Sequence, residues 1–138
     1  MREIKFRGLV INGLANGDKW ISADDEFHDV YLNHADKLAY INGHEVEYKS
    51  VTQYTGLKDK NGRDIYEGDV LDGSYINPLS DERTEKLYKV VYGNGGFGAN
   101  MIGSHPFGST LLRFENKGST VIGNIYENPE LLEGEVNA

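Results

Sequence analysis

Oxygen-bearing side chains gather in the stretch VTQYTGLKDKNGRDIYEGDVL, which spans residues 51–71. They are Asp59, Asn61, Asp64 and Glu67. Carboxylate and amide oxygens are the ligands that Ca²⁺ prefers, so a calcium loop is the first chemistry to consider. In the helix–loop–helix calcium site a glycine occupies the sixth loop position, whereas Gly62 is the fourth residue counted from Asp59. We therefore interpret this stretch as a solvated turn between two strands.

The histidines offer a second route to a metal site. They are His28, His34, His44 and His105. Imidazole and carboxylate groups suit zinc, and one segment holds four such residues, His28, Asp29, His34 and Asp36. No pair among them has a spacing typical of metal ligands, and the chain has no cysteine. We predict neither a bound metal nor a cofactor.

Two further patterns suggest catalysis at first sight. The sequence GNGGFG at residues 93–98 lacks the Gly-Lys-Ser/Thr ending of a phosphate loop, and no helical pattern follows it, so it favours a hairpin connection. Ser104 stands beside His105, but adjacent residues of a strand point to opposite faces and cannot form a nucleophile–base pair. A glycine–serine elbow is absent. We predict no catalytic residues and a protein that is not an enzyme.

The apolar pattern predicts a series of short strands. Runs of β-branched and aromatic residues alternate with polar ones and are separated by turn signals such as Asn42-Gly43 and Asn61-Gly62. Trp20 is the expected core anchor of the early strands. The expected strands cover residues 2–7, 19–22, 30–32, 37–41, 44–48, 51–55, 70–71, 87–92, 109–115 and 119–125. The sequence therefore predicts a mainly β protein.

Two other segments read differently. Residues 72–86 are long and polar, which predicts a loop that is either functional or mobile. Asn128-Pro129-Glu130 predicts a short helical turn, with the asparagine as N-cap and the proline at the first position.

Composition and charge limit the function classes. A chain of 138 residues with 38% hydrophobic residues suffices for one globular domain, with or without a small appendage. Its net charge is −8, and both halves are acidic, which disfavours binding to nucleic-acid phosphates. Apolar runs are too short to span a bilayer, and the missing cysteines fit a reducing compartment. We expect a cytoplasmic protein that does not bind membranes.

Three pieces of the sequence resemble a known family. The stretch QYTGLKDKNGRDIYEGDVL resembles the core signature of the YopX family, the opening MREIKFR its amino terminus, and VIGNIYENPELL at residues 121–132 its carboxy-terminal signature. Bacteriophages and prophages encode most members of this family. The resemblance implies an SH3-like barrel in a mostly β fold, and it implies no known activity. We accordingly expect residues 1–50 to form a β-meander and residues 51–138 the barrel, packed as one compact unit and closed by the helical turn.

The tyrosines of the signature segments are the candidate binding residues. Tyr54, Tyr66 and Tyr126 fall in these segments, and aromatic rings with polar tips are common where a small barrel binds a peptide or a partner subunit. The alternative is that they pack in the core and bond through their hydroxyls.

The sequence leaves three functions open, of which the third, an enzyme with dispersed acidic residues, would require a deep pocket that holds converging carboxylates or a His–acid pair. The first is a non-catalytic module for protein binding or assembly, which acts in a bacterial host on a protein partner or by self-association, because an edge strand of a small β domain is often covered by a second copy. The second is an accessory protein that associates with nucleic acid through its SH3-like barrel. Only fold analogy supports the second function.

Overall fold

The computed structural model describes residues 4–24, 28–93, 95–103 and 109–132. It divides into two compact units, Met1–Gly56 and Leu57–Ala138. The sequence prediction placed this division at residue 51. Each unit has its own apolar core. The units are therefore described one at a time.

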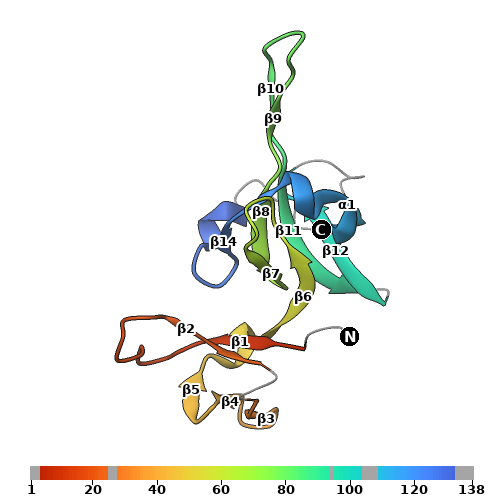
Figure 1. The fold of residues 1–138 in the computed structure, drawn as a ribbon. Coiled ribbons are helices and arrows are strands. Elements are labelled where there is room, and N and C mark those ends of the chain that lie inside the picture. Colours follow the sequence, from red (N-terminus) through yellow and green to blue (C-terminus); the bar gives the residue numbers. More distant parts are fainter. Residues whose placement is uncertain (1–3, 25–27, 94, 104–108, 133–138) are drawn as a thin grey trace. The chain divides into compact units, whose positions relative to one another are not determined.

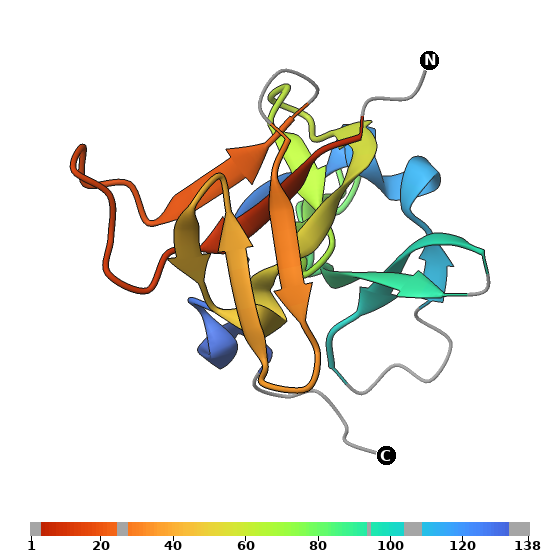
Figure 2. The ribbon, with the colours of Figure 1, turned by 90° about the horizontal axis from the view of Figure 1, so that it is seen from below.

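The first unit contains two antiparallel sheets. Its elements are β1 (Phe6–Leu9), β2 (Trp20–Ala23), β3 (Val30–Asn33), β4 (Leu38–Ile41), β5 (His44–Val46), the 3-10 turn η1 (Tyr48–Ser50) and the start of β6 (Thr52–Lys58). Strand β1 pairs with both β2 and β6, and β4 pairs with both β3 and β5 (Figure 2). The core of this unit consists of Ala23, Ala39, Ile41 and Val46, which are all buried.

One local prediction is confirmed in this unit, and two other features differ from what the sequence predicts. The Asn42-Gly43 turn joins β4 to β5 as a tight hairpin. The first strand, predicted over residues 2–7, is β1 (Phe6–Leu9). After it, Val10 makes a single bridge to Val46. Trp20, the expected core anchor, is only half-buried, and its ring lies 4.4 Å from the guanidinium carbon of Arg7.

The second unit is organised around a five-stranded antiparallel sheet with the order β13-β12-β11-β8-β14. Its strands are β7 (Asp64–Tyr66), β8 (Asp69–Asp72), β9 (Tyr75–Ile76), β10 (Arg83–Thr84), β11 (Leu87–Gly93), β12 (Gly96–Met101), β13 (Ser109–Leu111) and β14 (Thr120–Asn124). Its helical elements are α1 (Leu112–Glu115), η2 (Asn116–Gly118) and η3 (Pro129–Leu132). The core centres on the buried residues Ile65, Leu71, Tyr88, Val90, Ala99, Leu112 and Val121.

The mainly β architecture is confirmed, but the described residues do not form a closed barrel. Strand order leaves β13 and β14 at opposite edges of the five-stranded sheet, so the sheet stays open. The residues of GNGGFG outside Asn94 belong to a hairpin between β11 and β12, as predicted. The helical turn predicted at Asn128-Pro129-Glu130 is η3.

One element was assigned to the wrong class by the sequence. Residues 109–115 were predicted as a strand, yet the strand ends at Leu111 and α1 follows. Leu112 and Asn116, four positions apart, are both buried, whereas Arg113 and Phe114 between them are exposed. This is the spacing of a helical face, which a short run of leucine and phenylalanine does not distinguish from strand alternation.

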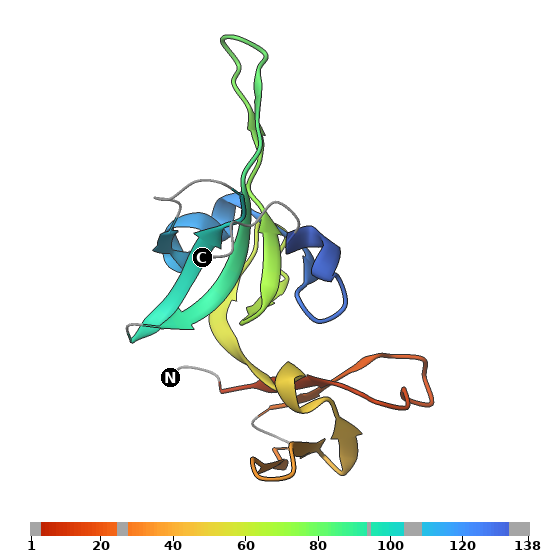
Figure 3. The same cartoon turned by 180° about the vertical axis from the view of Figure 1, so that it is seen from behind.

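A hairpin replaces the predicted loop at residues 72–86. Strands β9 and β10 pair through Ile76 with Arg83 and Tyr75 with Thr84. Figures 1 and 3 show this hairpin extending well beyond the rest of the second unit. We call residues 75–84 the arm.

Candidate functional site

Asp59, the first candidate calcium ligand, is the buried hub of a turn whose residues 60–63 are exposed, as expected for a solvated turn. Its Oδ1 accepts the backbone N–H groups of Asn61 at 2.8 Å and Arg63 at 2.9 Å. Its Oδ2 accepts the N–H of Val121 at 2.9 Å, so one carboxylate fastens the β6–β7 turn to β14. The side chain is 6% exposed. With three backbone donors in place, this carboxylate has a structural role that accounts for its position.

These bonds also set the charge state of Asp59. Burial alone raises the pKa of a carboxyl group, because it disfavours the charged form. The three N–H donors and the nearby guanidinium of Arg63 outweigh this effect and hold the pKa of Asp59 below its ordinary value. The carboxylate therefore stays ionised at neutral pH and is a poor general acid.

The other side chains considered as calcium ligands, and set aside because of the position of Gly62, lie along the turns and the strand that follow Asp59. Asp64 forms an ion pair with Lys58, while Asn61 and Glu67 lie elsewhere on the turns that flank β7. Burial raises the pKa of Glu67. Within the described part of the chain, no group of three or more His, Cys, Asp or Glu side chains is arranged to hold a metal ion.

The histidine segment is likewise built from local contacts. The ring of His28 lies edge-on to Phe6, with the ring centres 5.7 Å apart. His34 bonds to the hydroxyl of Tyr48 through Nδ1, and the Asp36 carboxylate accepts a bond from Asn33. The Ser104-His105 pair lies outside the described residues.

Two more polar side chains bond to the backbone, Asp69 in the core signature segment and Asn116 outside the signature segments. Asp69, 1% exposed, accepts the N–H of Tyr66 at 2.8 Å across the turn before β8. Asn116 donates from Nδ2 to the carbonyl of Lys58 at 2.7 Å and so joins η2 to the end of β6. Sequence reasoning missed Asn116, because an asparagine in a predicted turn shows no sign of a distant partner.

The carboxy-terminal signature closes on itself. Asn124 Oδ1 accepts the N–H groups of Tyr126 and Glu127, and Asn128 Oδ1 accepts the N–H of Asn124. The backbone at Gly123 passes so close that an added Cβ would lie 2.5 Å from Asn128 Oδ1. The GNIYENPELL pattern thus describes a compact turn after β14.

The three candidate tyrosines are mostly enclosed. Tyr54 and Tyr66 are 4% and 6% exposed, and Tyr126 is half-buried. Tyr126 packs on Gly68, which has a φ of +90° and whose added Cβ would lie 2.8 Å from the Tyr126 ring. Glycine is therefore required at position 68 for both its conformation and its small size. These placements favour the packing alternative, and partner binding through the tyrosines stays a prediction.

Exposed apolar side chains occur instead on the arm, where the sequence predicted a polar loop. Tyr75 is 50% exposed, Ile76 62% and Leu79 96%. The arm is nevertheless well ordered by hydrogen bonds. Asn77 Oδ1 accepts the N–H of Leu79 at 2.9 Å, and the Asn77 carbonyl accepts the N–H of Asp81 at 2.8 Å. The hydrogen bonds therefore order the backbone of the arm, and the Leu79 side chain extends from it into solvent.

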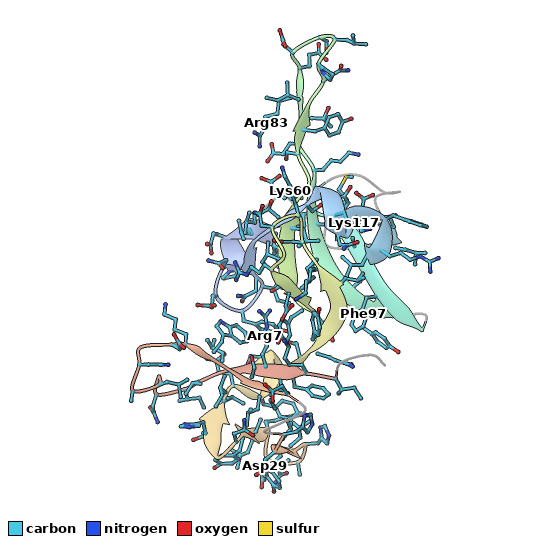
Figure 4. All side chains as sticks on the ribbon, in the orientation of Figure 1. Arg7, Asp29, Lys60, Arg83, Phe97 and Lys117 are labelled. Atoms are coloured by element: carbon cyan, nitrogen blue, oxygen red, sulfur yellow. The ribbon has the colours of Figure 1, made fainter. Side chains whose placement is uncertain are left out.

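A second exposed surface lies on α1 and η2. Leu112 and Asn116 face inward, so the opposite side of this segment displays Arg113, Phe114 and Lys117 to solvent. Phe114 is 67% exposed, and the guanidinium carbon of Arg113 lies 5.3 Å from its ring centre. Figure 4 labels Lys117 at the end of the second unit from which the arm, with Arg83, extends.

A buried tyrosine fixes the orientation of α1. Tyr88 on β11 is 2% exposed and bonds to the side chain of Glu115. Burial, followed by the charge of Glu115, raises the pKa of Tyr88. The hydroxyl of Tyr88 therefore stays protonated and donates a hydrogen bond to the Glu115 carboxylate. This bond holds the outer side of α1 toward solvent.

Together these features define a small, mainly β protein whose signature residues organise turns. The chain belongs to the YopX family, because the family model described as YopX protein matches residues 14–133. The opening MREIKFR lies outside this matched range.

A solved structure is similar over nearly the full length. This is the crystal structure of protein EF1440 from Enterococcus faecalis, with 26% sequence identity and a TM-score of 0.51. The match covers 94% of this chain and 98% of that chain. No curated protein matches the chain. None of the described helices has the length and apolar character needed to cross a membrane.

Proposed function

We propose that this protein is a non-catalytic module for protein binding or assembly, and that the arm is its contact element. The observation that supports this most strongly is Leu79, which is 96% exposed at the end of an ordered hairpin. An isolated two-stranded hairpin is only marginally stable in water, and its open edges invite pairing with another chain. The hydrogen-bonded backbone of its tip lowers the entropy cost of binding a partner through Leu79.

The distribution of polar groups agrees with a role outside catalysis. Asp59 and Asp69 are buried and accept backbone N–H groups, so their oxygens are engaged in holding turns. A catalytic acid or base needs access to a reacting group and a pKa near the working pH. Asp59, with its lowered pKa, does not meet these needs.

We extend two features of the family to this protein as part of the same proposal. One is a bacteriophage or prophage origin with action in the host cytoplasm. The other is an SH3-like arrangement of the second unit, in which β8, β11 and β12 form the central meander. An experimental structure that showed a different strand order would remove the fold part of this hypothesis.

A capture experiment tests the function. The full chain, tagged and immobilised, is incubated with lysate of bacteria that also express an untagged copy of the chain, beside two tagged variants, Leu79→Asp and Ile11→Asp. Both replace an exposed aliphatic side chain by a carboxylate, but Ile11, 50% exposed, belongs to the first unit, whereas the arm belongs to the second. We expect specific protein capture by the wild type and Ile11→Asp, and its loss in Leu79→Asp. Equal capture by all three proteins would contradict a role for the arm.

Nucleic-acid association is the second candidate, and Arg113 and Lys117 on one surface favour it. Proteins that bind duplex DNA through its phosphates commonly neutralise several of them, and their affinity falls steeply with salt. A gel-shift titration at low salt decides between the candidates. We expect no shift for this acidic protein, and a salt-sensitive shift abolished by Arg113→Glu would favour nucleic acid.

A further inference from the structure

The tip of the arm combines an apolar side chain with negative charge. Leu79 stands between backbone bonds that fix the loop, and the carboxylates of Asp81 and Glu82 follow it, all exposed. Arg83, the next residue, pairs in strand register with Ile76. We call Leu79, Asp81 and Glu82 the arm tip. A surface complementary to it needs an apolar contact bordered by positive charge.

The same chain presents such a surface. Arg113, Phe114 and Lys117 lie on the outer side of the α1–η2 segment, and we call them the basic patch. Positions i, i+1 and i+4 of a helix span about 100° of its circumference, so the aromatic ring lies beside both cations. Phe114 is 67% exposed, an unusual state for a large aromatic side chain.

We propose that the arm tip of one copy docks on the basic patch of a second copy, and that the arm tip of the second copy docks on the basic patch of the first. The inference rests on the proposed function, because it names the partner of the arm. Within one copy the contact does not form: Leu79 is 96% exposed, and Figure 1 shows the arm directed away from α1.

Charge selects this pairing over a contact between two like surfaces. Leu79 meets the ring of Phe114, and the carboxylates of Asp81 and Glu82 meet the cations of the patch. The chain as a whole has a net charge of −8, so copies repel at long range. At physiological salt this repulsion is screened beyond about 8 Å, which leaves the local pairing to decide the orientation.

Reciprocal exchange also makes the assembly finite. When tip meets patch twice around a two-fold axis, all four surfaces are used and the complex stops at a dimer. A single, unreciprocated contact would leave a free tip and a free patch and would propagate into a chain of copies.

Charge-reversed variants test the pairing directly by sedimentation equilibrium of the full chain. The first variant carries Asp81→Lys and Glu82→Lys, and the second carries Arg113→Glu and Lys117→Glu. Each variant alone places like charges at both contacts, so we expect its dimer dissociation constant to rise at least about tenfold over wild type. In an equimolar mixture the lysine tip meets the glutamate patch and the native tip meets the native patch. We therefore expect the mixture to form a heterodimer.

Two further variants complete the experiment. Leu79→Asp should weaken the wild-type dimer, whereas Ile11→Asp, in the other unit, should leave it unchanged. Urea unfolding of every variant confirms that it is folded. A wild-type monomer at the highest accessible concentration, or a dimer unaffected by both charge reversals, would overturn the inference.

The outcome also separates this inference from the proposed function. If the wild type is monomeric but Leu79→Asp still abolishes capture from lysate, the arm binds a different protein and only the second-copy assignment is wrong. If neither self-association nor capture depends on Leu79, both are wrong.

Discussion

Two turns of the second unit are ordered by the same kind of side-chain to backbone hydrogen bond, but only one of them is also bonded to a distant strand. Asp59 and Asn77 each accept the N–H of the residue two positions later, Asn61 and Leu79 respectively, through a side-chain oxygen. Asp59 has a second oxygen, which accepts the N–H of Val121 and so ties the base of the turn to a distant strand. The hydrogen bonds of Asn77 with Leu79, Ser80, Asp81 and Glu82 all lie within the arm, and its turn projects into solvent.

The difference separates residues that build the fold from residues that are available for binding. A side chain that bonds a segment sixty residues away stabilises tertiary structure. A side chain that orders only the backbone of its own loop leaves the neighbouring Leu79 exposed. Asp59 belongs to the stretch of residues 51–71 that resembles the family's core signature, whereas Leu79 lies outside that stretch but inside residues 14–133, which the family model matches.

Removing the hub of the structural turn should have the largest effect. Asp59→Ala leaves three N–H groups without their acceptor, including that of Val121 in the interior. Losing hydrogen bonds to a buried charged group costs about 3 kcal/mol or more of unfolding free energy. Urea denaturation followed by circular dichroism measures this loss. Asp59→Asn, which keeps one oxygen, should lose about half as much, and equal stability of Asp59→Ala and wild type would contradict the hub role.

Lowering the pH should gradually remove the contribution of Asp59 to the unfolding free energy. Because the pKa of Asp59 is lowered on folding, the unfolded chain binds the proton more readily, and stability rises with pH. The contribution is complete above the ordinary pKa of 3.8 and is lost as pH falls through the lower pKa of the folded state. Urea midpoints of wild type and Asp59→Asn should therefore converge between about pH 5 and pH 2. A constant difference across this range would exclude Asp59 as its source.

The tight turn after β14 should tolerate no added methyl group. In Gly123→Ala the new Cβ would lie 2.5 Å from Asn128 Oδ1 and 2.9 Å from Leu131 Cδ1. Such overpacking costs about 1–3 kcal/mol. Gly118→Ala is the matched control, since nothing lies within 4 Å of its added Cβ. Thermal unfolding of the two variants should differ clearly, and similar melting temperatures would place η3 elsewhere.

The arm tip should contribute least to stability. Leu79→Asp alters a side chain that is 96% exposed, so the unfolding free energy of the monomer should change by no more than about 0.5 kcal/mol. Ile65→Ala, at a fully buried site of the same unit, should cost about 2–5 kcal/mol. These values are compared by urea denaturation at low protein concentration. A large loss in Leu79→Asp would show that the arm packs on the rest of the molecule.

Local patterns sufficed to predict much of the fold. Turn signals such as Asn42-Gly43 and Asn61-Gly62 act within a few residues, and the hairpins they predict are present. The α1 segment was missed because Leu112 and Asn116 bury one face only through contacts with distant strands. The arm was missed because its order comes from the hydrogen bonds of Asn77, and a polar composition does not reveal them.

The candidate site was harder to predict for a related reason. Sequence alone drew attention to Asp59 and the signature tyrosines, since they belong to recognisable motifs. Their burial and backbone partners depend on the folded chain. Leu79 and Phe114 belong to no motif, and only the structure gives their exposure.

Amide hydrogen exchange at low and high protein concentration tests the contrast between the two turns most directly. The N–H of Val121, bonded to Asp59, should be protected equally at both concentrations. Peptides that contain Leu79 and Phe114 should exchange rapidly when dilute and become protected together as the concentration rises. Protection of the arm that never depends on concentration, or rapid exchange at Val121, would contradict the division into a structural turn and a binding arm.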